Sequence, residues 1–235
     1  MPMNAEIIPA VMPNHFDDIE ASAALVKNSV TTIQLDLMDG KYVSEKTWPF
    51  YYSTDYDLTN LLNEDGQLPF WEEVNYELDL MVTRPEESLD TWLHVGASRV
   101  IFHYASINNW KLIKEIDPGI RNFIEIGCAI TIHDDLPDII ELIKENTFDF
   151  IQVMGIAHIG YQGEPFEESI IEIIDVLKNT FPDLIISVDG GVSLDTVGPL
   201  ADGGVTRFVS GSAVFAHGSA DENIEALKYE IVEGE

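Results

Sequence analysis

The sequence is poor in cysteine and in basic side chains, and each shortage excludes a class of protein. Cys128 is the only cysteine among 235 residues, which leaves no internal disulfide and no cysteine-rich zinc site. Only 12 Lys and Arg stand against 42 Asp and Glu, for a formal net charge of −30. Because nucleic acid and anionic membranes are bound mainly through basic side chains, we expect neither as a partner.

Long apolar segments are missing as well. No apolar run approaches the roughly 20 residues needed to cross a bilayer, and residues 1–8 lack the basic start and apolar stretch of a secretion signal. We therefore expect a cytoplasmic protein. Hydrophobic residues still make up 46% of the chain, which is enough for a large buried core and argues against intrinsic disorder.

Short β-rich runs alternate with amphipathic helical stretches along the whole chain. This alternation and the chain length predict one domain over residues 1–235, an α/β fold of the (β/α)₈ TIM-barrel type, with an open doubly wound sheet as the alternative. The expected strands are residues 7–12, 31–38, 76–82, 99–104, 123–130, 148–154, 184–188 and 207–209. The expected helices are residues 17–28, a helix opened by Pro85, 110–116, 136–145, 166–181 and 223–231.

A long loop at about residues 40–74 interrupts this pattern. It is acidic and aromatic, with Trp48, Tyr51 and Tyr52 close together. Long loops in compact domains are usually lids or binding loops. A surface that packs on a neighbouring subunit is an equal alternative, so a homo-oligomer is possible.

Carboxylates and one amide stand at the ends of apolar strands. Asp36 and Asp79 lie inside the second and third expected strands, and Asp189 ends the seventh. Gln34 shares a strand face with Asp36 because side chains alternate along a strand. A carboxylate in an apolar strand is costly unless it is paired, hydrated or bound to a metal, so three at one barrel end predict a shared polar site.

Glycine-containing turns follow the last three expected strands. Glycine lets the backbone approach an anion closely and point N–H groups at it, and barrel enzymes often hold a phosphate after strands seven and eight. Ordinary turns are the alternative. The predicted phosphate-binding residues are Gly160, Gly163, Gly190, Gly191, Gly211 and Ser212.

Four further side chains have weaker patterns. We interpret His103, at the end of the fourth strand, as a structural histidine in preference to a substrate contact. His158 is either a solvated loop residue or a replacement for a lost polar group. Lys41 is expected in solvent and Cys128 in the core.

Taken in order along the chain, these motifs resemble the ribulose-phosphate 3-epimerase family of ribulose-phosphate-binding barrels. The resemblance covers nearly the whole chain, and the motifs are fairly specific as a set. They are Ile8-Pro9-Ala10, Leu35-Asp36-Leu37-Met38-Asp39-Gly40-Lys41-Tyr42-Val43, Leu78-Asp79-Leu80-Met81-Val82, Val153-Met154, the loop 160–166, Val188-Asp189-Gly190-Gly191-Val192 and Gly211-Ser212-Ala213-Val214-Phe215.

The resemblance implies an isomerase of the pentose phosphate pathway that interconverts ribulose 5-phosphate and xylulose 5-phosphate. In that family two aspartates flank the sugar phosphate, one removing the C3 proton and the other returning a proton to the opposite face. Asp36 and Asp189 fall on these positions. Two well-placed acid–base groups suit this chemistry.

The same resemblance implies a divalent metal, held by two histidines and the two catalytic aspartates. Gln34 and Asp79 stand at the histidine positions here, so the candidate ligands are Gln34, Asp36, Asp79 and Asp189. Such oxygen donors suit Mg²⁺ or Mn²⁺ better than Zn²⁺. Binding without any metal is the alternative.

The other departures bear on the reaction. Ala10 replaces a serine on the first strand, and residues 155–159 replace an Asn-Pro pair. A catalytically silent or altered-specificity sugar-phosphate-binding barrel is therefore the alternative function. Related lyases and decarboxylases resemble one another through Asp-x-Lys-x-x-Asp on the third strand, which has no lysine here, so that interpretation is disfavoured.

Overall fold

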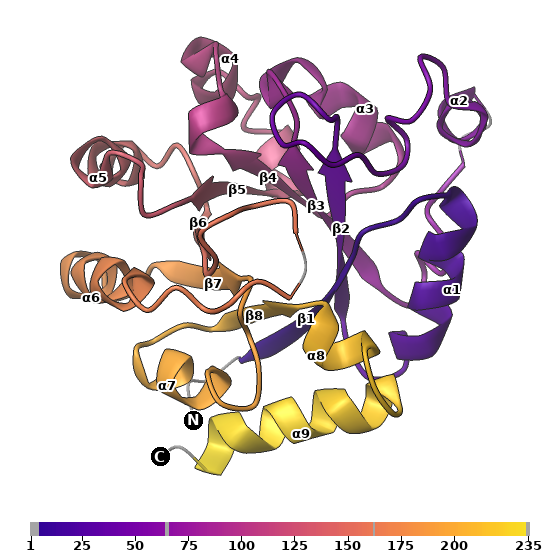
Figure 1. Cartoon of the computed structure of the whole chain (residues 1–235). Coiled ribbons are helices and arrows are strands. Elements are labelled where there is room, and N and C mark those ends of the chain that lie inside the picture. The colour runs from indigo at the N-terminus through magenta and orange to yellow at the C-terminus, as the bar shows by residue number, and fades with distance from the viewer. Residues whose placement is uncertain (1–4, 64–65, 162, 234–235) are drawn as a thin grey trace. The chain divides into compact units, whose positions relative to one another are not determined.

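Eight parallel strands form the centre of the fold. In the computed structural model, which describes residues 5–63, 66–161 and 163–233, they pair in chain order and β8 pairs with β1 to close a barrel (Figure 1). The predicted (β/α)₈ TIM barrel is confirmed. The strands are β1 Glu6–Val11, β2 Thr32–Met38, β3 Asn75–Met81, β4 Arg99–His103, β5 Glu125–Ile130, β6 Phe150–Met154, β7 Ile185–Asp189 and β8 Arg207–Ser210.

Helices follow the strands, and some of them begin at a capping side chain. In α5, for example, the Asp135 carboxylate accepts the Asp138 N–H at 3.3 Å, and Pro137 occupies the first turn. None of the helices in the described ranges is long and apolar enough to cross a membrane. They are α1 Phe16–Val26, α2 Tyr56–Asn63, α3 Leu89–His94, α4 Trp110–Lys114, α5 Leu136–Lys144, α6 Ile170–Thr180, α7 Val197–Asp202, α8 Ser212–Phe215 and α9 Ala220–Glu233, with 3₁₀ turns η1 Pro85–Glu87, η2 Tyr104–Ser106 and η3 Ile120–Asn122.

The start of α6 differs from the prediction. The sequence predicts a helix from residue 166, whereas α6 begins at Ile170. Phe166 instead forms an antiparallel bridge with Ile156, and the Glu167 N–H donates to the Gly155 carbonyl at 2.9 Å. The loop after β6 therefore takes up the first residues of the predicted helix.

The segment 40–74 contains a helix where the sequence indicated a long loop; residues 64 and 65 lie outside the described residues. It contains α2, whose first turn is capped by Asp55 through the Leu58 N–H at 2.9 Å. The Trp48 indole N–H donates to the same carboxylate oxygen at 3.0 Å. Next to them is a hollow of about 510 Å³ lined partly by Tyr51 and Tyr52. The role of the segment 40–74 as a lid or as a subunit contact stays a prediction.

The chain divides into two compact units, whose boundaries fall inside β1 and β5. The N-terminal unit comprises residues 10–127, and the C-terminal unit comprises residues 1–9 and 128–235. Each has its own core of large apolar side chains that are at most 1% exposed. Examples are Leu35, Leu80 and Phe102 in the first unit and Phe150, Val188 and Phe208 in the second.

Ion pairs tie the beginnings of the strands together within each unit. In the N-terminal unit Arg99 lies 3.1 Å from Glu77 and 3.1 Å from Glu125, each time between a guanidinium nitrogen and a carboxylate oxygen. In the C-terminal unit Arg207 Nε lies 3.8 Å from Glu6 Oε2. In barrels of this type the N-terminal strand ends serve stability, and the opposite ends carry the site.

Candidate active site

The N-terminal unit contributes a buried group on β2 and β3. Gln34 and Asp36 lie on one face of β2, and Asp36 pairs in register with Asp79 of β3. Gln34 and Asp79 are fully buried and Asp36 is 7% exposed. The Gln34 amide Nε2 donates to Asp36 Oδ1 at 2.8 Å. The strand register thus brings three of the predicted ligands together inside this unit.

Two carboxylates side by side in a buried position require a compensating charge. Adjacent strands are about 5 Å apart, so paired Asp36 and Asp79 repel each other when both are ionised. Carboxylates that lose their hydration are stabilised by ion pairs or by metal coordination. The donor set of this strand pair therefore fits a divalent cation.

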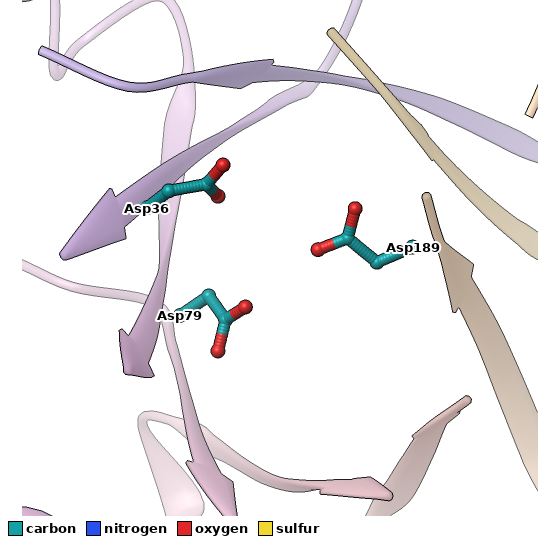
Figure 2. A group of neighbouring side chains, drawn as sticks. All are labelled: Asp36, Asp79 and Asp189. Carbon is teal, nitrogen blue, oxygen red and sulfur yellow. The ribbon is translucent and has the colours of Figure 1, made fainter. Parts of the chain in front are cut away.

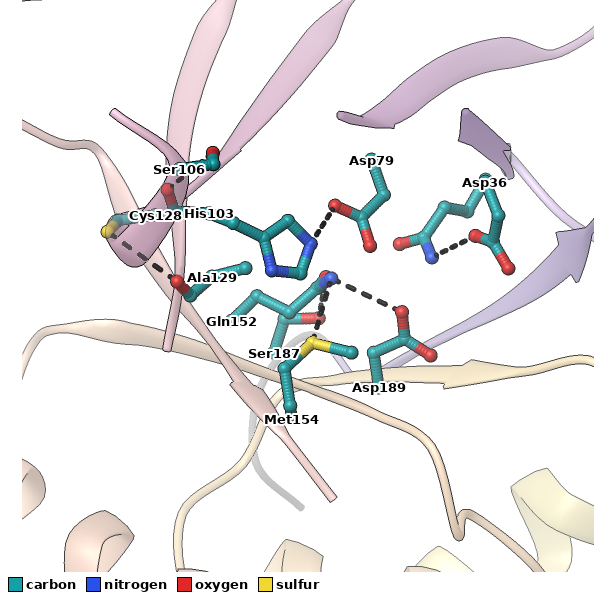
Figure 3. Close-up of polar contacts among 11 residues, drawn as sticks. Asp36, Asp79, His103, Ser106, Cys128, Ala129, Gln152, Met154, Ser187 and Asp189 are labelled. Atoms are coloured by element: carbon teal, nitrogen blue, oxygen red, sulfur yellow. Dashed lines mark hydrogen bonds and ion pairs between the residues drawn. The ribbon is translucent and has the colours of Figure 1, made fainter. Parts of the chain in front are cut away.

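His103, at the end of β4, has its polar contact with Asp79. The His103 Nε2 lies 2.8 Å from Asp79 Oδ1, and the two side chains are 1% and 0% exposed (Figure 3). The Tyr42 ring packs against the imidazole at a centroid distance of 5.4 Å. His103 is thus a buried, hydrogen-bonded histidine, as expected, but its partner is one of the candidate metal ligands.

The segment that follows β2 is fastened beside Asp36. The Thr47 hydroxyl donates to the Asp36 carbonyl at 2.7 Å and accepts the Met38 N–H at 2.9 Å. Sequence reasoning missed Thr47, because nothing near it in the chain indicates this return contact. It fixes the backbone from which the Asp36 side chain extends.

Asp39, three residues beyond Asp36, has a structural role. Its Oδ1 accepts the N–H groups of Lys41 and Tyr42 at 2.8 and 3.0 Å, and its Oδ2 accepts that of Thr83 at 3.0 Å. Burial alone raises the pKa of Asp39, but these backbone N–H bonds outweigh it and leave the pKa below its usual value. An ionised Asp39 therefore joins the turns after β2 and β3.

The C-terminal unit contributes Asp189 at the end of β7. The Gln152 amide of β6 donates to Asp189 Oδ2 at 3.3 Å, and the Ser187 hydroxyl donates to Gln152 Oε1 at 3.4 Å. Gln152 and Ser187 are buried, and sequence reasoning missed both. A glutamine inside the apolar strand Phe150–Met154 is the signal that would have revealed the first.

Glycine conformations in the same unit fit the predicted turns. Gly190 and Gly191 have φ values of +92° and +68°, and a Cβ on Gly191 would lie 2.9 Å from the Phe166 Cα. Gly160 and Gly163 also have positive φ, whereas Gln162 between them lies outside the described residues. Gly211 precedes the short helix α8, which begins at Ser212. These backbones therefore favour glycine at four of the predicted phosphate-binding positions.

Figure 2 shows the three carboxylates that are candidate metal ligands, Asp36 and Asp79 on the N-terminal unit and Asp189 on the C-terminal unit. The donors of this group are hard oxygen atoms, which divalent Mg²⁺ and Mn²⁺ accept. Gln34 adds an amide beside Asp36.

The remaining candidates lie outside this group. The His158 side chain is 75% exposed and contacts Glu164 at 3.3 Å, which fits a solvated loop residue. Lys41 is exposed. Cys128 is fully buried, as expected, and desolvation there raises the pKa of its thiol, with a smaller contribution from Asp134.

Comparisons with known proteins identify the family of this chain. The model of the Ribulose-phosphate 3 epimerase family matches residues 6–215. Ribulose-phosphate 3-epimerase of Schizosaccharomyces pombe is 26% identical over 99% of this chain and 96% of its own length. The cytoplasmic isoform of ribulose-phosphate 3-epimerase from Oryza sativa is 28% identical over 95% of this chain and 93% of its own.

Solved structures agree on the fold. The crystal structure of KGPDC from Streptococcus mutans has a TM-score of 0.70 at 14% identity, covering 98% of this chain and 99% of that one. Such a likeness establishes the barrel architecture alone. Because the family match spans all eight strands, the chain belongs to the ribulose-phosphate 3-epimerase family, whose members are carbohydrate epimerases.

Proposed function

We propose that this protein interconverts ribulose 5-phosphate and xylulose 5-phosphate by inverting carbon 3. The observation that carries the proposal is the buried pair Asp36 and Asp79 at the C-terminal ends of β2 and β3, in a chain of this family. A buried carboxylate next to a hydrogen-bonding amide is a suitable proton acceptor, because it is held in one orientation and shielded from water.

In this proposal Asp36 and Asp189 exchange protons with opposite faces of the sugar. One carboxylate takes the C3 proton, and the C–H electron pair moves toward the C2 carbonyl, which gives an enediolate. The other aspartate, protonated beforehand, delivers its proton to C3 from the opposite face, and the electrons return to form the ketone. Gln34 holds Asp36 at one oxygen, and Gln152 holds Asp189 in the same way.

Gln34, Asp36, Asp79 and Asp189 would hold a divalent ion. When bound, the ion supplies positive charge that stabilises the negative oxygens of the substrate and offsets the repulsion among the carboxylates. The oxygen donors favour Mg²⁺ or Mn²⁺ over Zn²⁺.

The sugar phosphate group would be held by the backbone of the C-terminal unit. Gly190 and Gly191 have the positive φ values that let N–H groups converge on an anion, and α8 begins at Ser212 with N–H groups that lack partners within the helix. Gly160, Gly163 and Gly211 would complete this cradle. Such a site needs no lysine or arginine, which suits a chain with few basic residues.

Solvent exchange of the C3 proton tests the proposal directly. Purified protein is incubated with ribulose 5-phosphate in D₂O with Mg²⁺, Mn²⁺ or Zn²⁺, and deuterium at C3 is followed by NMR. Exchange in the wild type that disappears in Asp36→Asn and in Asp189→Asn is expected. His158→Leu serves as the matched control, since His158 is exposed.

A sugar-phosphate-binding protein without catalysis is the alternative, favoured by Gln34 and Asp79 at positions where the resemblance implies histidines. It predicts thermal stabilisation by ribulose 5-phosphate with no deuterium incorporation under any of the three metals. That result would end the epimerase proposal and leave the phosphate cradle intact. The cytoplasm is the expected location, as for the Oryza sativa relative named a cytoplasmic isoform.

A further inference from the structure

We propose that His103 is a positioning residue that sets the geometry of the Asp79 carboxylate and thereby the affinity of the cation site. The inference rests on the proposed function insofar as that function places a divalent ion on Asp79. It assigns a role to a residue on β4, outside the four candidate ligands. All contacts that carry it lie within the N-terminal unit.

The contact itself is short and shielded from water. His103 Nε2 and Asp79 Oδ1 are 2.8 Å apart, with side-chain exposures of 1% and 0%. An ionised carboxylate can only accept, so Nε2 is the donor when Asp79 is ionised. Hydrogen bonds to charged groups are stronger than neutral ones, and burial increases the effect. The bond therefore restrains one carboxylate oxygen, Oδ1, at the imidazole.

The hydrogen bonding of the second ring nitrogen, Nδ1, bears on the role of the imidazole. Within the described residues, His103 Nδ1 is buried and has no hydrogen-bond partner. Buried histidines with a purely structural role usually have both nitrogens satisfied, because an unmet polar atom costs free energy. Among the protein groups of the described residues, the hydrogen bond of the imidazole is the one to Asp79.

Its surroundings keep the ring in this orientation. The Tyr42 ring packs on one side at a centroid distance of 5.4 Å, and the Ser106 hydroxyl donates to the His103 carbonyl at 2.9 Å. The first contact restrains the ring and the second restrains the backbone where β4 passes into η2. Residues that orient a metal ligand in this way typically change metal affinity by roughly 10- to 100-fold when removed.

Mn²⁺ affinity of the full-length protein tests the inference without reference to turnover. Free Mn²⁺ is measured by EPR in titrations of the wild type, His103→Leu, His103→Gln and His103→Asn, with His158→Leu as the exposed-histidine control. A Gln side chain carries its amide nitrogen about as far from the backbone as His Nε2, whereas Asn is shorter. We expect affinity to fall about 10- to 100-fold in His103→Leu and His103→Asn and to recover partly in His103→Gln.

The outcomes separate this inference from the proposed function. Mn²⁺ affinity within twofold of wild type in folded His103→Leu overturns the inference alone and leaves the metal site standing. If His103→Leu does not fold, equal affinities of His103→Gln and His103→Asn overturn it instead. Wild-type protein that binds no Mn²⁺ overturns both the metal role and this inference. Wild-type protein that shows no C3 exchange, while the His103 variants show the expected series of Mn²⁺ affinities, contradicts only the epimerase reaction.

Discussion

Replacing Asp79 by Asn should stabilise the metal-free protein and destabilise the metal-bound one. Asp79 is fully buried and pairs in register with Asp36, which is 7% exposed. Two charges about 5 Å apart at an effective dielectric constant of about 20 repel each other by about 3 kcal/mol. The substitution removes this repulsion. It also weakens the bond from His103 Nε2, at a cost of about 1 kcal/mol.

The net gain of about 2 kcal/mol should raise the melting temperature in EDTA by about 4–8 °C for a chain of this length. With Mn²⁺ at about 100 times its dissociation constant, the wild type gains about 2.7 kcal/mol, which the variant largely forgoes. The order of stability should then reverse.

Urea unfolding followed by circular dichroism, with EDTA or with Mn²⁺, measures both free energies of unfolding. Asp39→Asn is the matched control, because Asp39 accepts three backbone N–H bonds and should be destabilised in both conditions. A variant Asp79→Asn that is less stable than wild type in EDTA would refute the reasoning, since the carboxylate pair would then carry no unfavourable charge.

Three further predictions concern other parts of the fold. Because the folded-state pKa of Asp39 is lowered, its ionised form stabilises the protein above the unfolded-state pKa of about 4, and this contribution is lost as the pH falls through the folded-state value. The difference in unfolding free energy between wild type and Asp39→Asn should therefore be largest near neutral pH and shrink in acid; a constant difference would contradict it. Gly191→Ala should lower the free energy of unfolding by about 1–3 kcal/mol and weaken sugar phosphate binding, since its Cβ would meet the Phe166 backbone. Gly163 has the same sign of φ and nothing within 4 Å of an added Cβ, so Gly163→Ala should cost about 1 kcal/mol in the same unfolding assay. Burial raises the pKa of the Cys128 thiol, so Ellman's reagent should leave the native protein unmodified and react at once in urea; fast reaction in native buffer would show that the core opens there.

The strands could be predicted from the sequence because a barrel strand is buried on both faces and appears as an apolar run. β2 is buried at every position, and its two polar residues beyond Thr32, Gln34 and Asp36, are conspicuous against that background. The alternation of side chains along a strand is sufficient to place both on one face. What the alternation leaves open is the register between strands, which pairs Asp36 with Asp79.

Contacts that depend on tertiary structure could not be predicted in the same way. Thr47 bonds to the backbone at Asp36, eleven residues earlier, because the intervening turn folds back. The helix α2 was not predicted, because it lies in a segment whose aromatic and acidic residues indicate a loop. Gln152 was detectable as a polar residue in an apolar strand, but its partner Asp189 is 37 residues away. In each case the local pattern is compatible with several partners, and packing selects one.

The strand pair β3 and β4 shows how the same fold treats two buried carboxylates differently. Glu77 and Asp79 lie on one face of β3, two residues apart, and Glu77 pairs in register with Arg99. The guanidinium is always charged, so Arg99, which also contacts Glu125, gives Glu77 a permanent positive partner in a structural ion-pair network. Asp79 instead contacts the His103 imidazole, which, unlike a guanidinium, carries no permanent charge. An arginine at residue 103 would compete with a divalent ion for Asp79, whereas an imidazole leaves the negative charge available to it.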